Sequence, residues 1–248
     1  MGPLYVVSDV HGHRDDLAHG LGSAGLLDEN GRWTGGDAQL WVLGDLTDRG
    51  PDGIGVVNLV RGLQAQAPDQ VHVLMGNHEI LALGRARFPK TRFAGSWRAN
   101  GGLARDQAGL TEDDLAWLAG LPVAARVGDE LLVHSDTLEY LSWGDSVDEI
   151  NATVTGSLDD GGFLEHWDVW ARLTSRYDFA GDEGPGAARR LLDSLGGERI
   201  VHGHSIIGSL LGVRSTEVRS ALLYAEGLVL AIDGGRYDGG PLLVVRLR

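Results

Sequence analysis

The sequence predicts an α/β protein, because short apolar runs typical of strands alternate with stretches that have helical spacing. Seven such runs recur, and most are apolar at every position, as expected of strands buried on both faces. They are Leu4–Val7, Leu40–Leu43, Val71–Leu74, Leu131–Val133, Ile200–Val201, Leu228–Ile232 and Leu242–Leu247. Strand, loop, helix and strand in succession are typical of an α/β fold.

The stretches between the first four runs have the spacing of amphipathic helices. The apolar positions of the first two stretches are Leu17, Leu21, Ile54, Val57 and Leu63. Residues at these intervals share one face of a helix, which predicts that this face is buried. Further along, Thr111 followed by Asp114 predicts a capping box at the start of a helix that contains Leu115–Leu118.

Length and cysteine content limit the kinds of protein that this chain can be. At 248 residues it can bury a sizeable core, and we expect a single domain over residues 1–248. The sequence contains no cysteine. This excludes disulfides, thiolate zinc sites, iron–sulfur clusters and a cysteine nucleophile. Any metal ion must therefore be bound by nitrogen and oxygen atoms.

The charge balance excludes another class of partner. The chain has 21 Lys and Arg against 35 Asp and Glu, a net charge of −14. Such an acidic protein is not expected to bind nucleic acid through its phosphates, although it can act on phosphates if cations mediate. There is no stretch of 18 consecutive apolar residues and no basic leader. We therefore expect a cytoplasmic protein without a membrane partner.

One segment departs from the acidic average. Residues 84–105 contain no acidic residue and six basic ones, namely Arg85, Arg87, Lys90, Arg92, Arg98 and Arg105. Two interpretations are open. The segment is either a solvated helix face or partner surface, or a basic flap beside the active site that receives an anionic substrate.

A polar motif follows five of the predicted strands directly. The motifs are Asp9-Val10-His11, Gly44-Asp45-Leu46-Thr47-Asp48-Arg49-Gly50, Gly76-Asn77-His78-Glu79, His134-Ser135-Asp136 and His202-Gly203-His204. Ligands of open α/β sheets bind outside the carboxyl ends of the strands, so we expect these loops to converge on one point. The glycines beside the polar residues permit tight turns there.

The side chains of these loops are the set that a two-cation hydrolytic site needs. Such a site requires a bridging carboxylate, several imidazole and carboxylate ligands, and open positions for water and substrate. The assigned ligands are Asp9 and His11 for the first ion, Asp45 as the bridge, and Asn77, His134 and His204 for the second ion. Any one of these motifs arises often by chance, and it is their conjunction that predicts the site.

The ligand chemistry narrows the choice of metal. Imidazole and carboxylate without thiolate suit manganese, iron, zinc or nickel better than calcium or magnesium. We expect two divalent metal ions, with manganese as the first candidate and iron, zinc or nickel as alternatives. His202 is the nearest competing histidine, and we expect it not to bind a metal directly.

The motifs resemble those of a known family. The stretches at Asp9, Asp45 and Asn77 are similar to the three signature motifs of the phosphoprotein phosphatase family of calcineurin-like metallophosphoesterases. The resemblance continues through Trp97–Gly102, His134–Asp136, Trp170–Arg172, Gly203–Ser205 and Ile232–Gly235. It covers nearly the whole chain and is greatest to the bacterial and bacteriophage serine/threonine phosphatases. It implies an αββα sandwich of two mixed sheets flanked by helices.

The resemblance also implies roles for residues that are not ligands. His78 would protonate the leaving oxygen, Asp48 would orient His78, and Arg49 would bind the phosphate. Many family members have an arginine where this chain has Met75. A second phosphate contact must then be absent or come from elsewhere, and we expect Arg172, with Arg98 as the alternative.

The predicted function is hydrolysis of phosphate monoesters by in-line attack of a water that the two metal ions activate. The first candidate substrate is a phosphorylated protein, with the chain acting as a serine/threonine phosphatase. The alternative is a phosphate-containing small molecule, with the chain acting as a symmetrical dinucleoside polyphosphate hydrolase or nucleotide phosphatase. A catalytically inactive scaffold is the third interpretation, and the complete ligand set with His78 and Asp48 argues against it.

Overall fold

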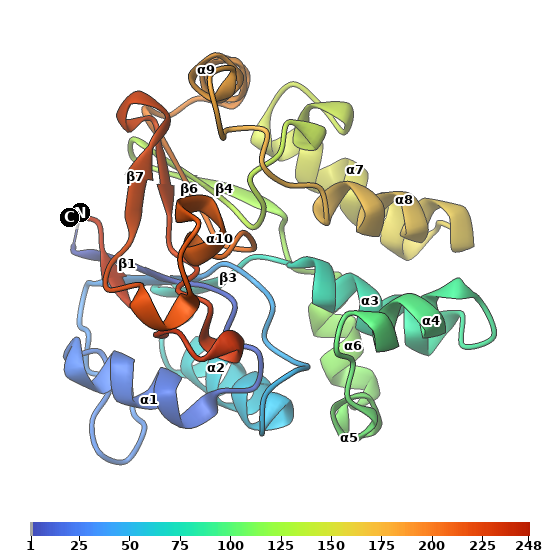
Figure 1. Cartoon of the computed structure of the whole chain (residues 1–248). Helices are drawn as coiled ribbons and strands as arrows, with labels where there is room; N and C mark the ends of the chain where they lie inside the picture. Colours follow the sequence, from blue (N-terminus) through green and yellow to red (C-terminus); the bar gives the residue numbers. More distant parts are fainter. Residues whose placement is uncertain (1) are drawn as a thin grey trace.

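The computed structural model describes residues 2–248 and contains two mixed sheets that face each other, with helices outside them (Figure 1). The first sheet has the order β3-β2-β1-β9, with β1 (Leu4–Val7), β2 (Gln39–Val42), β3 (Val71–Val73) and β9 (Val245–Arg246). The second has the order β4-β5-β6-β8-β7, with β4 (Ala124–Val127), β5 (Glu130–Val133), β6 (Arg199–His202), β7 (Leu222–Tyr224) and β8 (Val229–Ala231). The predicted fold class is confirmed.

The helices cover the outer faces and one side of the two sheets. Their bounds are α1 (Arg14–Ser23), α2 (Gly53–Gln66), α3 (Asn77–Arg87), α4 (Arg92–Ala99), α5 (Ala104–Gly109), α6 (Glu112–Ala119), α7 (Val147–Asp159), α8 (Phe163–Leu173), α9 (Gly184–Leu195) and α10 (Ile207–Leu211). In Figure 1, α1 and α2 lie below the first sheet and α9 lies above the second, while α3 to α8 gather at the right-hand side of both. Within residues 2–248, no helix has the length and apolar character needed to cross a membrane.

The apolar strands are buried on both faces because each one serves two cores. In β1, Leu4 and Val6 belong to the core between the sheets, together with Leu132 and Val201. Val7, which points to the opposite face, belongs to the larger core that includes residues of α1 and α2. This alternation follows from the two-residue period of a strand, and it explains why the strand sequences are apolar throughout.

Most elements lie where the pattern predicts them, and the exceptions have local causes. The capping box forms, since Thr111 Oγ1 accepts from Asp114 N (3.1 Å) and Asp114 Oδ2 accepts from Thr111 N (2.9 Å). The pattern did not predict β4, which reads Ala-Ala-Arg-Val, or β7, an edge strand whose residues are half-buried or exposed. Of the predicted run Leu242–Leu247, Val245 and Arg246 form the strand β9, and Leu247 N donates to Leu4 O of β1 (2.8 Å).

Parallel pairing brings the polar motifs to one edge of the sandwich. In the first sheet β1, β2 and β3 are parallel, and in the second β5, β6 and β8 are parallel. The carboxyl ends of these six strands therefore lie together, as expected for a site in an α/β sheet. In the second sheet His202 pairs with Ala231, so that His204 and Asp233 lie at matching positions just beyond two neighbouring strands.

Candidate metal centre and active site

The loops after the strands hold their polar residues in an unusual backbone conformation. Six of the predicted site residues have positive φ, namely Asp9 (49°), His11 (42°), Asp45 (56°), Asp48 (69°), Arg49 (62°) and His204 (61°). Each such conformation costs on the order of 1–3 kcal/mol in a non-glycine residue, and it persists only where the surrounding structure enforces it. A concentration of such residues at one edge is typical of a functional site.

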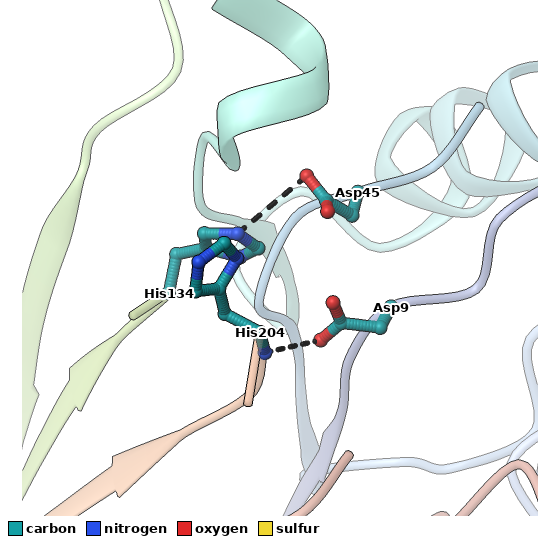
Figure 2. Close-up of side chains that lie close together, drawn as sticks. All are labelled: Asp9, Asp45, His134 and His204. Atoms are coloured by element: carbon teal, nitrogen blue, oxygen red, sulfur yellow. Dashed lines mark hydrogen bonds and ion pairs between the residues drawn. The ribbon is translucent and has the colours of Figure 1, made fainter. Parts of the chain in front are cut away.

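Four side chains from both sheets point toward one another (Figure 2). Asp9, Asp45, His134 and His204 are all buried, and each offers an atom within 4.8 Å of those of the other three. A second group with the same spacing consists of His11, Asp45 and His78. The two groups share Asp45, which therefore occupies the position that a bridging ligand needs.

The two carboxylate oxygens of Asp45 face in different directions. Oδ1 lies 3.5 Å from His134 Nε2, and Oδ2 lies 3.5 Å from His11 Nε2. Oδ1 also accepts a hydrogen bond from the backbone N–H of His78 (2.9 Å), which fixes the rotation of the carboxylate. One residue can thus serve two cations at once.

Three histidines each use one ring nitrogen on a backbone carbonyl. The contacts are His11 Nδ1 to Thr47 O (3.0 Å), His134 Nδ1 to Leu43 O (2.7 Å) and His204 Nε2 to Thr174 O (3.0 Å). Because a carbonyl only accepts, the bonded nitrogen carries the proton and the other carries a lone pair. Metal-binding histidines are held in the same way in proteins.

The free atoms of this cluster fit divalent cations. His11 Nε2 is buried and has no hydrogen-bond partner within residues 2–248. Asn77 Oδ1 lies 3.1 Å from His134 Nε2, so that Asn77 joins the group on the His134 side. Burial raises the pKa of Asp45 well above its usual range, and the carboxylates of Asp9 and Glu79 raise it further. Buried carboxylates crowded together with lone-pair nitrogens need positive charge, which two divalent ions would supply.

His78 lies between a carboxylate, that of Asp48, and a guanidinium, that of Arg49. Its Nδ1 lies 2.8 Å from Asp48 Oδ2, and its Nε2 lies 3.1 Å from Arg49 Nη2. With both nitrogens in use, His78 has no free lone pair, although it lies beside Asp45. Burial lowers the pKa of His78 well below its usual range, and Arg49 lowers it further. Burial also raises the pKa of Asp48 to about 6.

Arg49 lies next to His78 and contacts two further residues. Its Nε donates to Asn100 O (3.1 Å), and its guanidinium lies 4.1 Å from the ring centroid of Tyr237. The same Tyr237 ring meets His11 edge to face at 5.2 Å and is 39% exposed. Tyr237 therefore forms a wall of the site, and no motif in the sequence indicated it.

The two arginines predicted for a second phosphate contact have other surroundings. The guanidinium of Arg172 forms ion pairs with Glu139 (2.5 Å) and Asp168 (2.7 Å). Arg98 is exposed on α4 and forms no ion pair with any residue of 2–248. Among residues 2–248, no hydrogen bond or ion pair joins either side chain to the histidines of the cluster.

A third arginine, Arg176, was missed by the sequence analysis. Burial lowers the pKa of His78 and of His204, and the positive charge of Arg176 contributes to both effects. Arg176 has no ion pair with any carboxylate that the structure describes. Its loop is fixed, because Asp136 accepts from the backbone N–H of Tyr177 through Oδ2 (3.0 Å). Arg176 follows Arg172 by four residues, outside any motif.

The basic segment 84–105 is folded into the helical side of the molecule rather than detached. Arg87 Nη1 donates to Leu158 O (2.7 Å) at the end of α7, and the Arg92 guanidinium lies 3.7 Å from the ring centroid of Trp167 on α8. The end of the segment reaches the loop that carries Asp48, since Leu103 N donates to Asp48 Oδ1 (3.0 Å) and Arg105 Nη2 donates to Gly50 O (2.6 Å). Several of the basic side chains thus serve packing.

Two further buried features hold the loops of the first sheet. Glu79 accepts from the backbone N–H groups of Asp45 (2.8 Å), Leu46 (2.9 Å) and Gly76 (2.8 Å). Gly44 has φ 91°, and a Cβ there would collide with the backbone of Gly76 and lie 3.1 Å from His134 Nδ1.

In the second sheet, both ring nitrogens of His202 have hydrogen-bond partners, Gly203 O (2.7 Å) and Tyr224 Oη (2.8 Å). Neither nitrogen is therefore free for a metal ion.

Comparison with known families gives one match over most of the chain. The sequence profile described as calcineurin-like phosphoesterase matches residues 2–208. The symmetrical bis(5'-nucleosyl)-tetraphosphatase of Acidovorax sp. is 31% identical over 183 residues, which are 68% of this chain and 58% of that protein. Shewanella-like protein phosphatase 2 of Arabidopsis thaliana is 31% identical over 81 residues, 32% of this chain and 21% of that protein. The matches thus span less than two thirds of these relatives.

Solved structures share the fold. A cold-active protein tyrosine phosphatase covers all of this chain and 74% of its own with a TM-score of 0.77 and 23% identity. A serine/threonine phosphatase from Saccharomyces cerevisiae covers 94% of this chain and 67% of its own with a TM-score of 0.58 and 16% identity. At these identities the likeness shows the fold alone.

Proposed function

The chain belongs to the calcineurin-like phosphoesterase family, and on this premise we propose that it is a metal-dependent phosphomonoester hydrolase acting on phosphoserine or phosphothreonine in proteins. The observation that carries the proposal is the position of Asp45 between two groups of ligands, next to the His78–Asp48 pair. An inactive scaffold would have no need to keep this strained and buried arrangement.

The proposed ligands divide between two ions. Asp9 and His11, whose Oδ1 and Nε2 atoms are 4.0 Å apart, would hold the first ion, Asn77, His134 and His204 the second, and Asp45 both. Asp9 also lies within 4.8 Å of the ligand atoms of His134 and His204, so it borders both ions. When bound, the ions would supply positive charge at the phosphate and an activated water for attack on phosphorus. We propose manganese as the first candidate metal.

His78 is the proposed proton donor to the leaving oxygen. Asp48 would hold Nδ1–H, so that Nε2 faces the substrate. In the structure Arg49 donates to Nε2, and its charge lowers the pKa of His78. A bound phosphate dianion would draw the Arg49 guanidinium to itself and offset its charge. The pKa of His78 would then rise, and the ring would carry the proton it needs to donate.

Two arginines are our candidates for binding a single phosphate. The charges of Arg49 and Arg176 both lower the pKa of His78. Two guanidinium groups match the oxygens of one phosphate. We propose that Arg49 and Arg176 bind it. To bind phosphate, Arg172 would have to break its ion pairs with Glu139 and Asp168. Arg172 and Arg98 are therefore the second-choice candidates for the phosphate contact.

A dinucleoside tetraphosphate is the second candidate substrate. The match to the symmetrical bis(5'-nucleosyl)-tetraphosphatase of Acidovorax sp. extends over 68% of this chain and favours it. The exposed ring of Tyr237 beside Arg49 could also stack on a base. A chain of four phosphates would need further cations than the two arginines named above.

The experiment that tests the proposal compares three substrates at equal manganese concentration. These are a phosphoserine peptide, a phosphotyrosine peptide and diadenosine tetraphosphate, with Asp45→Asn as the matched control for contaminating phosphatase. We expect kcat/KM for the phosphoserine peptide to exceed that for the dinucleotide at least about tenfold, a difference of about 1.4 kcal/mol. The opposite order would establish the second candidate. If the protein binds manganese but hydrolyses none of the three substrates, the interpretation as an inactive scaffold would be supported.

A further inference from the structure

The stretch that joins α4 to α5 is hydrogen-bonded to the loop that carries Asp48 and Arg49. Asn100 O accepts from Arg49 Nε (3.1 Å), and Gly101 O accepts from Arg49 N (3.0 Å). Leu103 N donates to Asp48 Oδ1 (3.0 Å), although the two residues are 55 positions apart in the chain. The stretch therefore supports the part of the site that holds the proposed proton donor.

One side chain of α5 takes part in the same support. Asp106 is 2% exposed, and its Oδ2 accepts a hydrogen bond from Asp48 N (3.0 Å). This oxygen is packed tightly, because a Cβ on Gly53 at the start of α2 would collide with it. Among residues 2–248, no hydrogen bond or ion pair joins the Asp106 side chain to a proposed metal ligand. Asp106 therefore contacts the backbone of the active-site loop and not the metal centre.

Asp48 needs support because its backbone and its carboxylate are both constrained. Its φ is 69°, a conformation that a non-glycine residue keeps only where the surrounding structure enforces it. Its Oδ2 lies 2.8 Å from His78 Nδ1, and a rotation of the Asp48 backbone would turn this oxygen away from the ring. The hydrogen bond from Asp48 N to Asp106 opposes such a rotation, since a buried backbone N–H without an acceptor is unfavourable.

We propose that Asp106 is a positioning residue for the His78–Asp48 pair, and that by accepting from Asp48 N it keeps Asp48 Oδ2 on His78 Nδ1. The inference rests on the proposed function, in which His78 donates a proton to the leaving oxygen. A carboxylate on Nδ1–H fixes the tautomer and the orientation of a catalytic imidazole. Arg49 keeps its own bonds to Asn100 O and Gly101 O, so that loss of Asp106 acts on proton transfer rather than on phosphate binding.

Two variants test this role. Asp106→Ala removes the acceptor, and Asp106→Asn keeps one carbonyl oxygen for Asp48 N. With manganese, we expect Asp106→Ala to lower kcat for a phosphoserine peptide about tenfold or more, and kcat for nitrophenyl phosphate less than about twofold, because the seryl leaving group needs the proton. KM for both substrates and the affinity for manganese should stay within about twofold of the wild type. Asp106→Asn should keep the wild-type ratio of the two kcat values.

Asp114→Ala is the matched control for a buried carboxylate with a structural role. Asp114 is 5% exposed on the next helix, α6, and it accepts from Thr111 N (2.9 Å) and Thr111 Oγ1 (2.7 Å). Its loss should lower the free energy of unfolding and leave the ratio of the two kcat values unchanged. An unchanged ratio in Asp106→Ala would overturn the inference, as would a loss in Asp106→Asn as large as that in Asp106→Ala.

Nuclear magnetic resonance of the metal-free protein follows the positioning itself. The nitrogen chemical shifts of the His78 ring show which nitrogen carries the proton, and His78→Asn identifies the signals. We expect the Nδ1–H form in the wild type and in Asp114→Ala, and a larger share of the Nε2–H form in Asp106→Ala. A wild-type spectrum in Asp106→Ala would contradict the role of Asp106. If Asp106→Ala does not fold, Asp106→Ser, whose side chain is one atom shorter than that of aspartate, takes its place with the same outcomes.

The tautomer of His78 separates this inference from the proposed function. If the wild type binds manganese but hydrolyses no phosphate ester, the proposed function fails, while the His78 spectrum still tests the role of Asp106. If the wild type hydrolyses both substrates and Asp106→Ala keeps the wild-type ratio and the wild-type spectrum, only the role of Asp106 fails.

Discussion

The two sheets position their site residues by different means. In the loops of the first sheet, five non-glycine residues have positive φ, and Glu79 accepts hydrogen bonds from three backbone N–H groups of these loops. In the loops of the second sheet, His204 is the site residue with positive φ, and Asp136 fixes the loop through Ser205 Oγ (2.5 Å) and Tyr177 N (3.0 Å). A buried carboxylate fixes the loops of each sheet, and the difference is that positive φ at non-glycine site residues is concentrated in the loops of the first sheet.

This difference between the sheets separates the residues proposed for catalysis from those proposed for binding. The loops of the first sheet carry the shared Asp45 and the His78–Asp48 pair, whose atoms must keep fixed positions. The loops of the second sheet add His134 and His204, and the adjoining loop adds Arg176. Substitutions in the first set should therefore damage catalysis most. In the second set, those of His134 and His204 should weaken binding of the second ion, and that of Arg176 should act on phosphate binding.

The largest effect is expected for Asp45→Asn. Both ions would lose the ligand that they share, so that turnover of an aryl phosphate should fall at least about 10³-fold, or about 4 kcal/mol in the activation barrier. The measurement is kcat/KM with manganese, accompanied by metal content. Turnover close to the wild type would contradict the position of Asp45 as the bridge.

His78→Asn should give the next largest effect, and it should depend on the leaving group. A seryl phosphate has a poor leaving group that needs a proton, so kcat should fall about 10²–10³-fold. For nitrophenyl phosphate the loss should be less than about tenfold, because this leaving group departs unprotonated. His72→Asn, outside the site, is the control. Equal losses on both substrates would show that His78 has another role.

Glu79→Gln and Asp136→Asn compare the two means of support directly. Glu79→Gln removes an acceptor from buried backbone N–H groups and should lower the free energy of unfolding by about 2–3 kcal/mol, with weaker binding of manganese. Asp136→Asn should cost about 1–3 kcal/mol and weaken inhibition by phosphate more than binding of manganese. Denaturant unfolding and metal titration measure both. If the two variants lose the same amounts of stability, manganese affinity and phosphate affinity, the loops of the two sheets do not differ in what they support.

The smallest effects are expected for Arg176, in the loop after α8, and for Arg172, at the end of α8. Arg176→Ala should weaken inhibition by inorganic phosphate about tenfold, which corresponds to one charge-assisted hydrogen bond. Arg172→Ala should leave inhibition within about twofold and cost at most about 1 kcal/mol of stability, because its ion pairs are partly exposed. The inhibition constant of phosphate decides between them, and the reverse pattern would restore Arg172 to the position predicted from sequence.

Prediction from the sequence succeeded where the information is local. Residues such as Asp45 and His134 follow apolar strands directly, and a parallel sheet brings all such strand ends to one edge. The six predicted ligands lie in one cluster for this reason, and their role in binding metal stays a proposal.

Arginines were predicted less well because their reach is long and their partners are distant in sequence. Arg172 stands in a family-like motif, yet Glu139 and Asp168 hold its guanidinium. The charge of Arg176 lowers the pKa of His78, and the turn beside it is fixed by Asp136, which accepts from Tyr177 N. Nothing in the neighbouring sequence distinguishes the two.

The sequence by itself determined the two-sided burial of the strands, the nitrogen and oxygen character of any metal site, and the identity of the polar residues at the strand ends. These properties depend on residue type and on periods of two or a few residues. The tertiary structure alone decided that ion pairs hold Arg172, that Tyr237 walls the site, and that Asp233 has a buried oxygen without a partner among residues 2–248. Such contacts join segments far apart in the chain, and they depend on how the two sheets pack against each other and on the path of each loop.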